Sequence, residues 1–211
     1  MKIRTSVYIQ IGLLLISIVL SIYYNGKLPE TVPTHWNIHN QVDQYGSKLM
    51  PVLLGPCMLL FSLLLTVALP KLSPKQYEID KFESTFAYAM VLVGGLMFFI
   101  SFCILKATDG VKMDFGSWFM AAMFIFFALL GNVLGKVRQN FYMGIKTPWT
   151  LASPQVWDAT HRMAGKLWFF GGILGAIVSI AGVPMGYTIA YMMIISLFPV
   201  VQSYFIYKKI G

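Results

Sequence analysis

Six long apolar runs dominate the pattern of hydrophobic and polar positions along the chain. None of them contains Asp, Glu, Lys, Arg or His, and each is close to the about 20 residues that a helix needs to cross about 30 Å of hydrocarbon. A β-barrel would instead show shorter segments of alternating polarity. We therefore predict an all-α, polytopic membrane protein with six transmembrane helices, at residues 7–24, 50–69, 86–105, 117–135, 167–183 and 187–207.

Composition supports this class, because 57% of the 211 residues are hydrophobic and only 11% are charged. Soluble domains of this size carry about 25% charged residues. Polar residues inside the runs, such as Gln10, are expected to form hydrogen bonds between helices. Small residues at helical spacing, including Gly131, Gly135, Gly171 and Gly175, allow close helix packing, either within one bundle or in a homo-oligomer.

The Lys and Arg residues between the runs predict the orientation. Segments on one side of the membrane carry twelve of them, and segments on the other side carry four. Because basic flanking segments stay in the cytoplasm, we predict that both termini are inside. The net charge of +8 then reflects topology and contact with anionic membrane lipid, and it requires no direct nucleic-acid partner.

The first outer segment, residues 25–49, has the composition of an ordered loop. Pro29 and Pro33 favour an extended conformation in the residues before them, so the stretch "NGKLPETVPTHWN" predicts a stiff arm. Asn40 and Gly46 are expected at turns. On this basis the loop is an ordered extracytoplasmic element and not a flexible linker.

Two histidines of this loop raise the question of a metal site. His35 and His39 are four residues apart, and Asp43 or Glu30 could complete a ligand set. A zinc-protease motif requires Glu directly after the first His, where this chain has Trp36. We therefore favour hydrogen-bonding roles in an ordered turn and expect no cofactor. A small transporter or a metal-dependent membrane enzyme that uses His35 and His39 is kept as the alternative.

The longest inner connection, residues 136–166, predicts a helix that begins at Ser153 and Pro154, with serine as N-cap and proline in the first turn. Trp157 and His161 share one face of this helix, and Asp158 is expected to pair with Arg162. Upstream of it, Gly144 and the stretch "KTPW" are expected at turns. We predict an interfacial cytoplasmic helix that runs into the fifth span, with its tryptophans anchored in the lipid interface. Because Asp158, Thr160 and His161 cannot all reach one substrate atom from a single helix, we do not expect an enzyme.

Two stretches resemble known families. "LPETVPTHWNIHNQVDQYGSK" resembles the signature of DUF1648, and "VRQNFYMGIKTPWTLASPQVWDATHRMAGKLW" resembles that of the SdpI family. The resemblance implies a DUF1648-like half at residues 1–84 and an SdpI-like half at residues 85–211. The outer motif corresponds to Pro33, His35, Trp36, Asn37, Asp43, Tyr45 and Lys48; the inner motif corresponds to Arg138, Asn140, Gly144, Thr147, Pro148, Trp149, Trp157, Thr160, His161, Arg162 and Gly165.

SdpI-type proteins of Gram-positive bacteria give immunity to a secreted peptide toxin, and one such protein also recruits a repressor to the membrane. The resemblance thus implies toxin binding by the outer motif, and partner docking or a structural role for the inner motif. In this interpretation Asp43 and Glu30 meet cations of the toxin, while Trp36 and Tyr45 supply apolar contact. The family usually has Gly soon after His-Trp-Asn, where this chain has "HNQVD", so toxin specificity is expected to differ.

Overall fold

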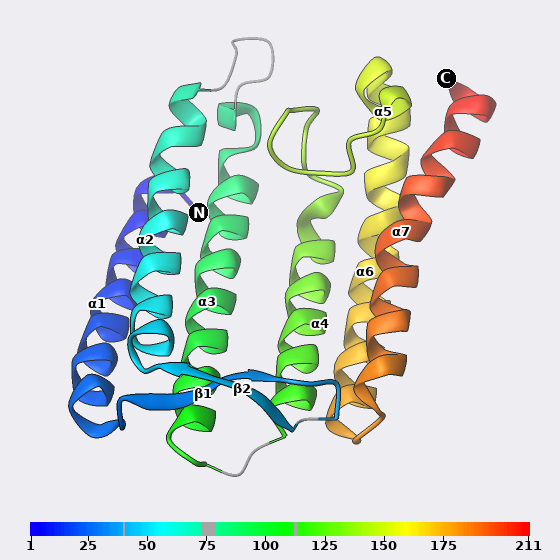
Figure 1. Ribbon diagram of the computed structural model, residues 1–211. Helices are drawn as coiled ribbons and strands as arrows, with labels where there is room; N and C mark the ends of the chain where they lie inside the picture. The colour runs from blue at the N-terminus through cyan, green and yellow to red at the C-terminus, as the bar shows by residue number, and fades with distance from the viewer. Residues whose placement is uncertain (40, 73–78, 112–113) are drawn as a thin grey trace.

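The computed structural model describes residues 1–39, 41–72, 79–111 and 114–211. It consists of long helices and one small antiparallel sheet (Figure 1). The expected turn residue Asn40 lies outside the described residues, as do Lys75 and Lys112, two of the basic residues counted for the orientation. Along the chain the elements are α1 (Ile3–Lys27), β1 (Thr31–Trp36), β2 (Val42–Ser47), α2 (Leu49–Leu72), the 3-10 helix η2 (Ile79–Phe82), α3 (Glu83–Thr108), α4 (Phe115–Leu134), α5 (Pro148–Ala152), α6 (Pro154–Ile180) and α7 (Met185–Ile210).

Six of these helices, α1, α2, α3, α4, α6 and α7, are long and apolar enough to cross a membrane. Each overlaps one of the six predicted apolar runs, although the runs at 117–135 and 167–183 extend past the ends of α4 and α6. The prediction of a polytopic, six-helix protein is confirmed. Pro56 lies inside α2 and Pro199 lies inside α7, and neither helix is interrupted. Large apolar side chains such as Ile22 and Phe170, 70% and 68% exposed, cover the outside of the bundle, as expected for surfaces that face lipid.

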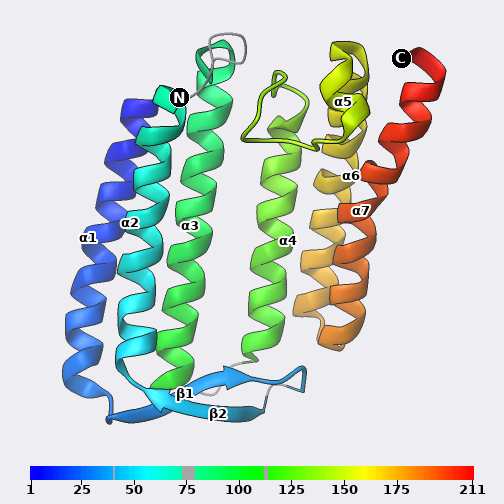
Figure 2. The same cartoon turned by 45° about the horizontal axis from the view of Figure 1, so that its top comes forward.

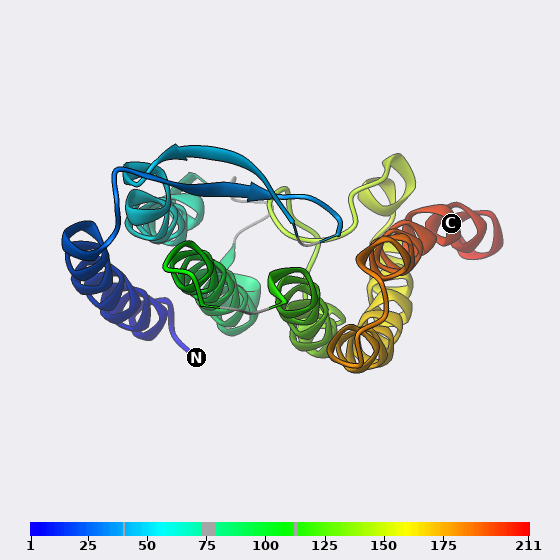
Figure 3. The same ribbon diagram turned by 60° about the horizontal axis from the view of Figure 1, so that its bottom comes forward.

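The helices form two adjacent groups. Viewed from the hairpin end, α1, α2 and α3 lie together, and α4 connects them to α6 and α7 (Figure 3). Helices α4 and α6 are in very close contact, because a Cβ atom on Gly131 would lie 2.7 Å from the carbonyl oxygen of Gly165. A Cβ atom on Gly175 would lie 2.2 Å from the ring of Phe124. At least part of the predicted small-residue pattern therefore serves packing within one chain.

A polar cluster joins α1 to α2 in the interior. The Gln10 side chain donates to Thr66 Oγ1 and accepts from Ser62 Oγ, both at 2.8 Å, and all three residues are buried. This confirms the predicted interhelical role of Gln10. Because no water is present in hydrocarbon to satisfy an amide, the three side chains stabilise one another and fix how α1 lies against α2.

The two ends of the bundle differ. Figure 2 shows both termini and α5 at one end, and the β1–β2 sheet at the other. An even number of spans requires the termini to share an end, and the first connection must then lie opposite. The assignment of the terminal end to the cytoplasm stays a prediction from the Lys and Arg distribution. The division into halves at residues 84 and 85 also stays a prediction.

Candidate functional site

The outer loop is a β-hairpin. Strands β1 and β2 pair antiparallel, with Val32 opposite Gly46 and Pro33 opposite Tyr45. The predicted extended arm is confirmed, but the placement of Gly46 in a turn is wrong, since it lies within β2. A side chain at Gly46 would press against Thr34, whose methyl group lies 3.1 Å from a Cβ built there. Glycine therefore serves strand packing at this position.

The base of the hairpin is fixed to the first helix group. Val32 is 1% exposed and belongs to a buried cluster with Tyr24, Leu28, Val52 and Leu105. The carbonyl of Pro33 accepts a long hydrogen bond from Thr108 at the end of α3, at 3.5 Å. Burial of an apolar strand residue against three helices gives the hairpin a fixed position over this group, which explains why the loop is ordered.

The distal part of the hairpin contacts the second helix group. The ring of Trp36 lies 5.3 Å from the ring of Phe115, the first residue of α4. Aromatic pairs at this separation add about 0.5–1.5 kcal/mol to their buried area. The hairpin therefore links α4 to the α1–α3 group, and Trp36 is only partly available for contact with a ligand.

Charged side chains of the hairpin form pairs within the chain. His35 Nδ1 lies 2.5 Å from Asp43 Oδ1, and Lys48 Nζ lies 2.9 Å from Glu30 Oε1. The Asp43 and Glu30 side chains are nevertheless 42% and 85% exposed. Exposed pairs of this kind contribute little to stability, so both carboxylates stay accessible to an external cation.

The tip of the hairpin is organised by Asn37. Its Oδ1 accepts from the backbone N–H groups of His39 and Gln41, at 2.9 and 3.1 Å. These two bonds hold the backbone at His39 and Gln41 against Asn37, and Ile38 beside them is 60% exposed. Tyr45 is also exposed, at 63%. The tip and β2 thus have large apolar side chains on the exposed surface of the hairpin.

The described residues offer little to a metal ion at His35 and His39. No group of three His, Cys, Asp or Glu side chains with metal-binding geometry occurs in the part of the chain that the structure describes. The Nδ1 atom of His35 is already engaged by Asp43. Zinc sites need three or four protein ligands, which this arrangement does not supply.

The inner motif is organised around His161. Its Nδ1–H donates to the carbonyl of Trp157 at 2.8 Å, and its Nε2 accepts from the backbone N–H of Ile145 at 2.9 Å. These two bonds define a neutral imidazole. The ring stacks on Trp157 at 4.0 Å, and both side chains are fully buried. The prediction of a helix from Pro154 into the fifth span is confirmed, but the assignment of Trp157 to lipid anchoring is wrong.

Gly144 completes this arrangement. Its φ is +123°, and a Cβ atom there would lie 2.4 Å from His161 Nε2 and 2.9 Å from the Trp157 ring. Only glycine combines this backbone conformation with such close approach. Gly144, Trp157 and His161, separated in sequence, therefore form one packing unit that holds the inner loop against α6.

Amide side chains fix the rest of the loop. Asn140 is fully buried and donates to the carbonyls of Arg138 and Met143, while its Oδ1 accepts from the N–H groups of Tyr142 and Met143. The neighbouring Gln139 donates to two carbonyls of α5. Asn140 is thus a structural residue, with its hydrogen-bonding groups occupied. The sequence analysis does not predict this role of Gln139. The only signal for it is a second amide side chain directly before Asn140, which can donate to backbone carbonyls in the same way.

The short helix α5 begins at another capped proline. Thr147 is its N-cap, Pro148 follows, and Thr147 and Thr150 form a reciprocal capping box. The hydroxyl of Ser203 on α7 lies 3.2 Å from Thr147 Oγ1 and accepts from Trp149 Nε1 at 2.5 Å. Ser203 was not predicted from the sequence. It connects the inner motif to the last span.

Asp158 pairs with a different arginine from the one expected. Its carboxylate lies 3.6 Å from Arg138, and the described residues show no ion pair between Asp158 and Arg162. Arg138 comes from the loop after α4, so the pair joins this loop to α6. Arg138 and Arg162 nevertheless line the same cavity. Within the inner motif, the hydroxyl of Thr160 is buried and has no hydrogen-bond partner among the described residues.

The two sets of predicted residues lie at opposite ends of the bundle (Figure 1). The outer set forms one hairpin surface, and the inner set forms one packed loop. They therefore cannot act on the same ligand directly. Any connection between them must pass through the spanning helices.

Comparison with known proteins matches both regions. Residues 136–203 match the SdpI/YfhL protein family, and residues 12–70 match the domain of unknown function DUF1648. The immunity protein SdpI of Bacillus subtilis (strain 168) is 26% identical over 207 residues, which are 96% of this chain and 96% of that protein. No solved structure gives a significant match. Both regions and the similarity along nearly the whole chain make this protein similar to SdpI-type proteins, and its six long apolar helices make it a multi-pass membrane protein.

Proposed function

We propose that this protein gives its cell immunity to a secreted antimicrobial peptide, and that the β1–β2 hairpin contacts the peptide. The observation that carries the proposal is the similarity of 96% of the chain to a protein named for immunity. The hairpin adds a suitable surface. It is ordered, it lies at the end opposite the termini, and it has exposed apolar side chains.

Recognition of a hydrophobic, cationic peptide suits the chemistry of this surface. Ile38 and Tyr45 are exposed and can bury apolar side chains of the peptide. The carboxylates of Asp43 and Glu30 are exposed although each has a basic partner. A cation of the peptide could compete for them at little cost, because exposed ion pairs contribute about 0–1 kcal/mol.

Protection of a sensitive strain tests this role. Cells that express the wild-type protein should survive peptide concentrations that kill cells without it. Tyr45→Ala and Asp43→Ala should each lower the tolerated concentration several-fold, because a central contact contributes about 1–2 kcal/mol. Protein levels in the membrane are measured in parallel by immunoblot.

Tyr187→Ala is the matched control, since Tyr187 is 72% exposed near the start of α7 and does not belong to the hairpin. It should protect as well as the wild type. If the two hairpin variants protect equally well at equal protein levels, the hairpin is not the binding surface. If the wild type gives no protection against any tested peptide of this class, the immunity proposal itself fails.

A sensory role is supported by one contact. Trp36 touches Phe115 at the start of α4, and α4 ends at Leu134, next to the inner loop. Peptide binding at the hairpin could therefore change the equilibrium of the inner loop and recruit a cytoplasmic repressor. By linkage, such a repressor must strengthen peptide binding by the same factor.

Limited proteolysis of inside-out membrane vesicles tests the sensory role. With peptide supplied to the vesicle interior, the cleavage rate at residues 136–146 should change in the wild type and stay constant in Phe115→Ala. An unchanged rate in the wild type would contradict signal transmission and leave protection unaffected.

The structure gives no comparable support to a transporter or a metal-dependent enzyme. In the described residues no metal-ligand cluster is assembled, and the two proline-containing spans are continuous helices. Transporter sites are typically built from discontinuous helices. We therefore propose a role without catalysis.

A further inference from the structure

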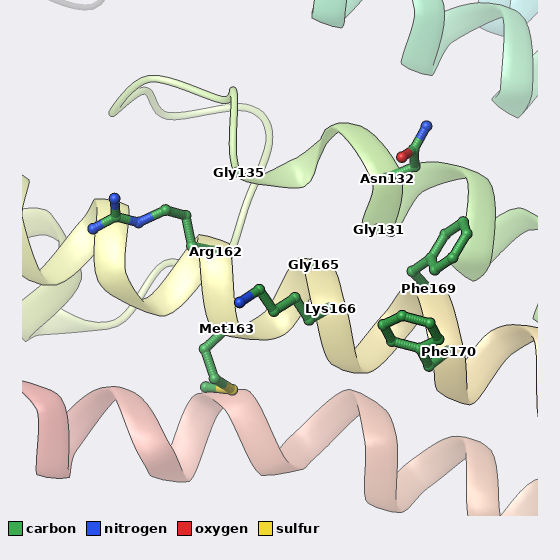
Figure 4. A pocket seen from close by; sticks show the side chains of 9 residues that line it. All are labelled: Gly131, Asn132, Gly135, Arg162, Met163, Gly165, Lys166, Phe169 and Phe170. Carbon is green, nitrogen blue, oxygen red and sulfur yellow. The ribbon is translucent and has the colours of Figure 1, made fainter.

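Two adjoining cavities lie at the end of the bundle that holds the termini. A polar cavity of about 440 Å³ lies between the starts of α3 and α6 and the end of α4. A larger cavity of about 730 Å³ follows the contact between α4 and α6 (Figure 4). The two share Gly135 and Arg162 in their walls, so they adjoin at these residues, and we call them together the recess, with a polar part and an apolar part.

The polar cavity is strongly basic. Its walls include four basic residues, which are Lys81, Lys136, Arg138 and Arg162, and one acidic residue, Asp158. Ser84 and Thr85 also line it; they belong to the first turn of α3, where backbone N–H groups have no partner within the helix and the helix dipole favours negative charge. Asp158 lies 3.6 Å from Arg138 and offsets its charge. Lys136 and Arg162 still leave the described part of the wall with an excess of positive charge, which favours an anionic ligand.

The larger cavity is mostly apolar. Figure 4 shows Arg162 at one end, Phe169 and Phe170 at the other, and Lys166 between them. The step from Arg162 to Phe170 along α6 corresponds to about 12 Å. Phe170 is 68% exposed on the outside of a spanning helix. The cavity therefore opens toward hydrocarbon, where an alkyl chain is its natural occupant.

We propose that this recess binds one anionic phospholipid, with the phosphate in the basic cavity and an acyl chain against Phe169 and Phe170. Basic pockets between transmembrane helices on the cytoplasmic side are suited to anionic headgroups. A free phosphate would use the same cations, but it would leave the apolar cavity empty. The shared wall at Gly135 and Arg162 places an apolar cavity directly beside the basic one, and this arrangement favours the lipid.

The site is tested on the purified full-length protein by native mass spectrometry with added phosphatidylglycerol or phosphatidylcholine. The wild type should retain phosphatidylglycerol preferentially. Arg162→Gln and Lys136→Gln should each weaken retention about fivefold, because a basic residue near a lipid surface contributes about 1 kcal/mol. The double variant Lys208→Gln/Lys209→Gln, which removes two cations at the end of α7, should bind as the wild type does.

Asp158→Asn serves as the gain-of-binding variant, because it removes an acidic side chain from the cavity wall and releases Arg138. It should retain phosphatidylglycerol several-fold more strongly, a result that loss of folding cannot produce. Equal retention of both lipids, or equal losses in the Lys208→Gln/Lys209→Gln control, would overturn the proposal. If millimolar inorganic phosphate displaces the lipid, the site recognises the anion alone and the apolar cavity adds nothing to binding. This result would also overturn the proposal.

Discussion

At the residue scale, the side chains of the inner motif pack against one another and form hydrogen bonds within the chain. His161 accepts from the N–H of Ile145 and stacks on Trp157, and Gly144 leaves room for both rings. A buried N–H group without a partner costs about 1–3 kcal/mol. Substitutions in this unit should therefore act first on stability, and effects on protection should follow from that loss.

Gly144→Ala tests the packing unit. The substitution forces alanine into a left-handed backbone conformation and places its Cβ within contact distance of His161 and Trp157. We expect a loss of about 2–4 kcal/mol in the free energy of unfolding. It is measured as a lower midpoint of thermal unfolding of the detergent-purified protein, together with faster proteolysis of the inner loop.

Gly12→Ala is the control for this prediction. A Cβ atom at Gly12 would have no neighbour within 4 Å, and alanine favours helix by about 1 kcal/mol over glycine. It should unfold at the wild-type temperature or slightly above. Equal stability of Gly144→Ala and Gly12→Ala would contradict the role assigned to Gly144.

At the element scale, the hairpin joins two helix groups. Its base is buried against α1, α2 and α3, and Trp36 contacts the start of α4. A two-stranded hairpin alone is marginally stable in water. Its order in this protein therefore depends on these contacts with the helices. The contact with α4 is a single ring pair, Trp36 with Phe115, so one substitution removes it.

A double-mutant cycle measures this contact. Trp36→Ala and Phe115→Ala should each reduce hydrogen-exchange protection of β1 amides, and the double variant should lose less than the sum. The interaction energy should be about 0.5–1.5 kcal/mol. Tyr45→Ala combined with Phe115→Ala is the additive control, because Tyr45 is 63% exposed. Additive losses for Trp36 and Phe115 would contradict the bridging role.

The sequence predicts elements where local chemistry decides them. Ser153 and Pro154 mark the start of α6, as the cap and proline rule requires. Thr147 and Pro148 carry the same signal and begin α5, so the stretch "KTPW", which predicts a turn, starts a short helix instead. The position of the β1–β2 hairpin depends on burial of Val32 against three helices. The partner of Asp158 depends on the path of the loop that carries Arg138. Local sequence patterns predict neither contact, because the residues that meet are distant in sequence.

At the scale of the whole molecule, hydrophobic length and charge distribution predict the number of spans and the relative placement of loops. The structure confirms six long apolar helices and places the hairpin opposite the termini. The sequence indicates the close contact of α4 with α6 only by its glycine spacing. That spacing fits helix packing within one chain or between two chains, so it does not predict which helices meet. The paired cavities beside this contact were not predicted, because Gly131, Arg162 and Phe170 line them from two different helices.

The central claim is that the hairpin faces the outside and the inner loop faces the cytosol, because both the immunity and the lipid proposals depend on it. With Cys57 and Cys103 replaced by alanine, Ile38→Cys and Gln155→Cys provide exposed probes at the two ends. Intact cells are treated with a membrane-impermeant maleimide. We expect labelling of Ile38→Cys alone, and of Gln155→Cys only after the cells are opened. Labelling of Gln155→Cys but not Ile38→Cys in intact cells would contradict the account.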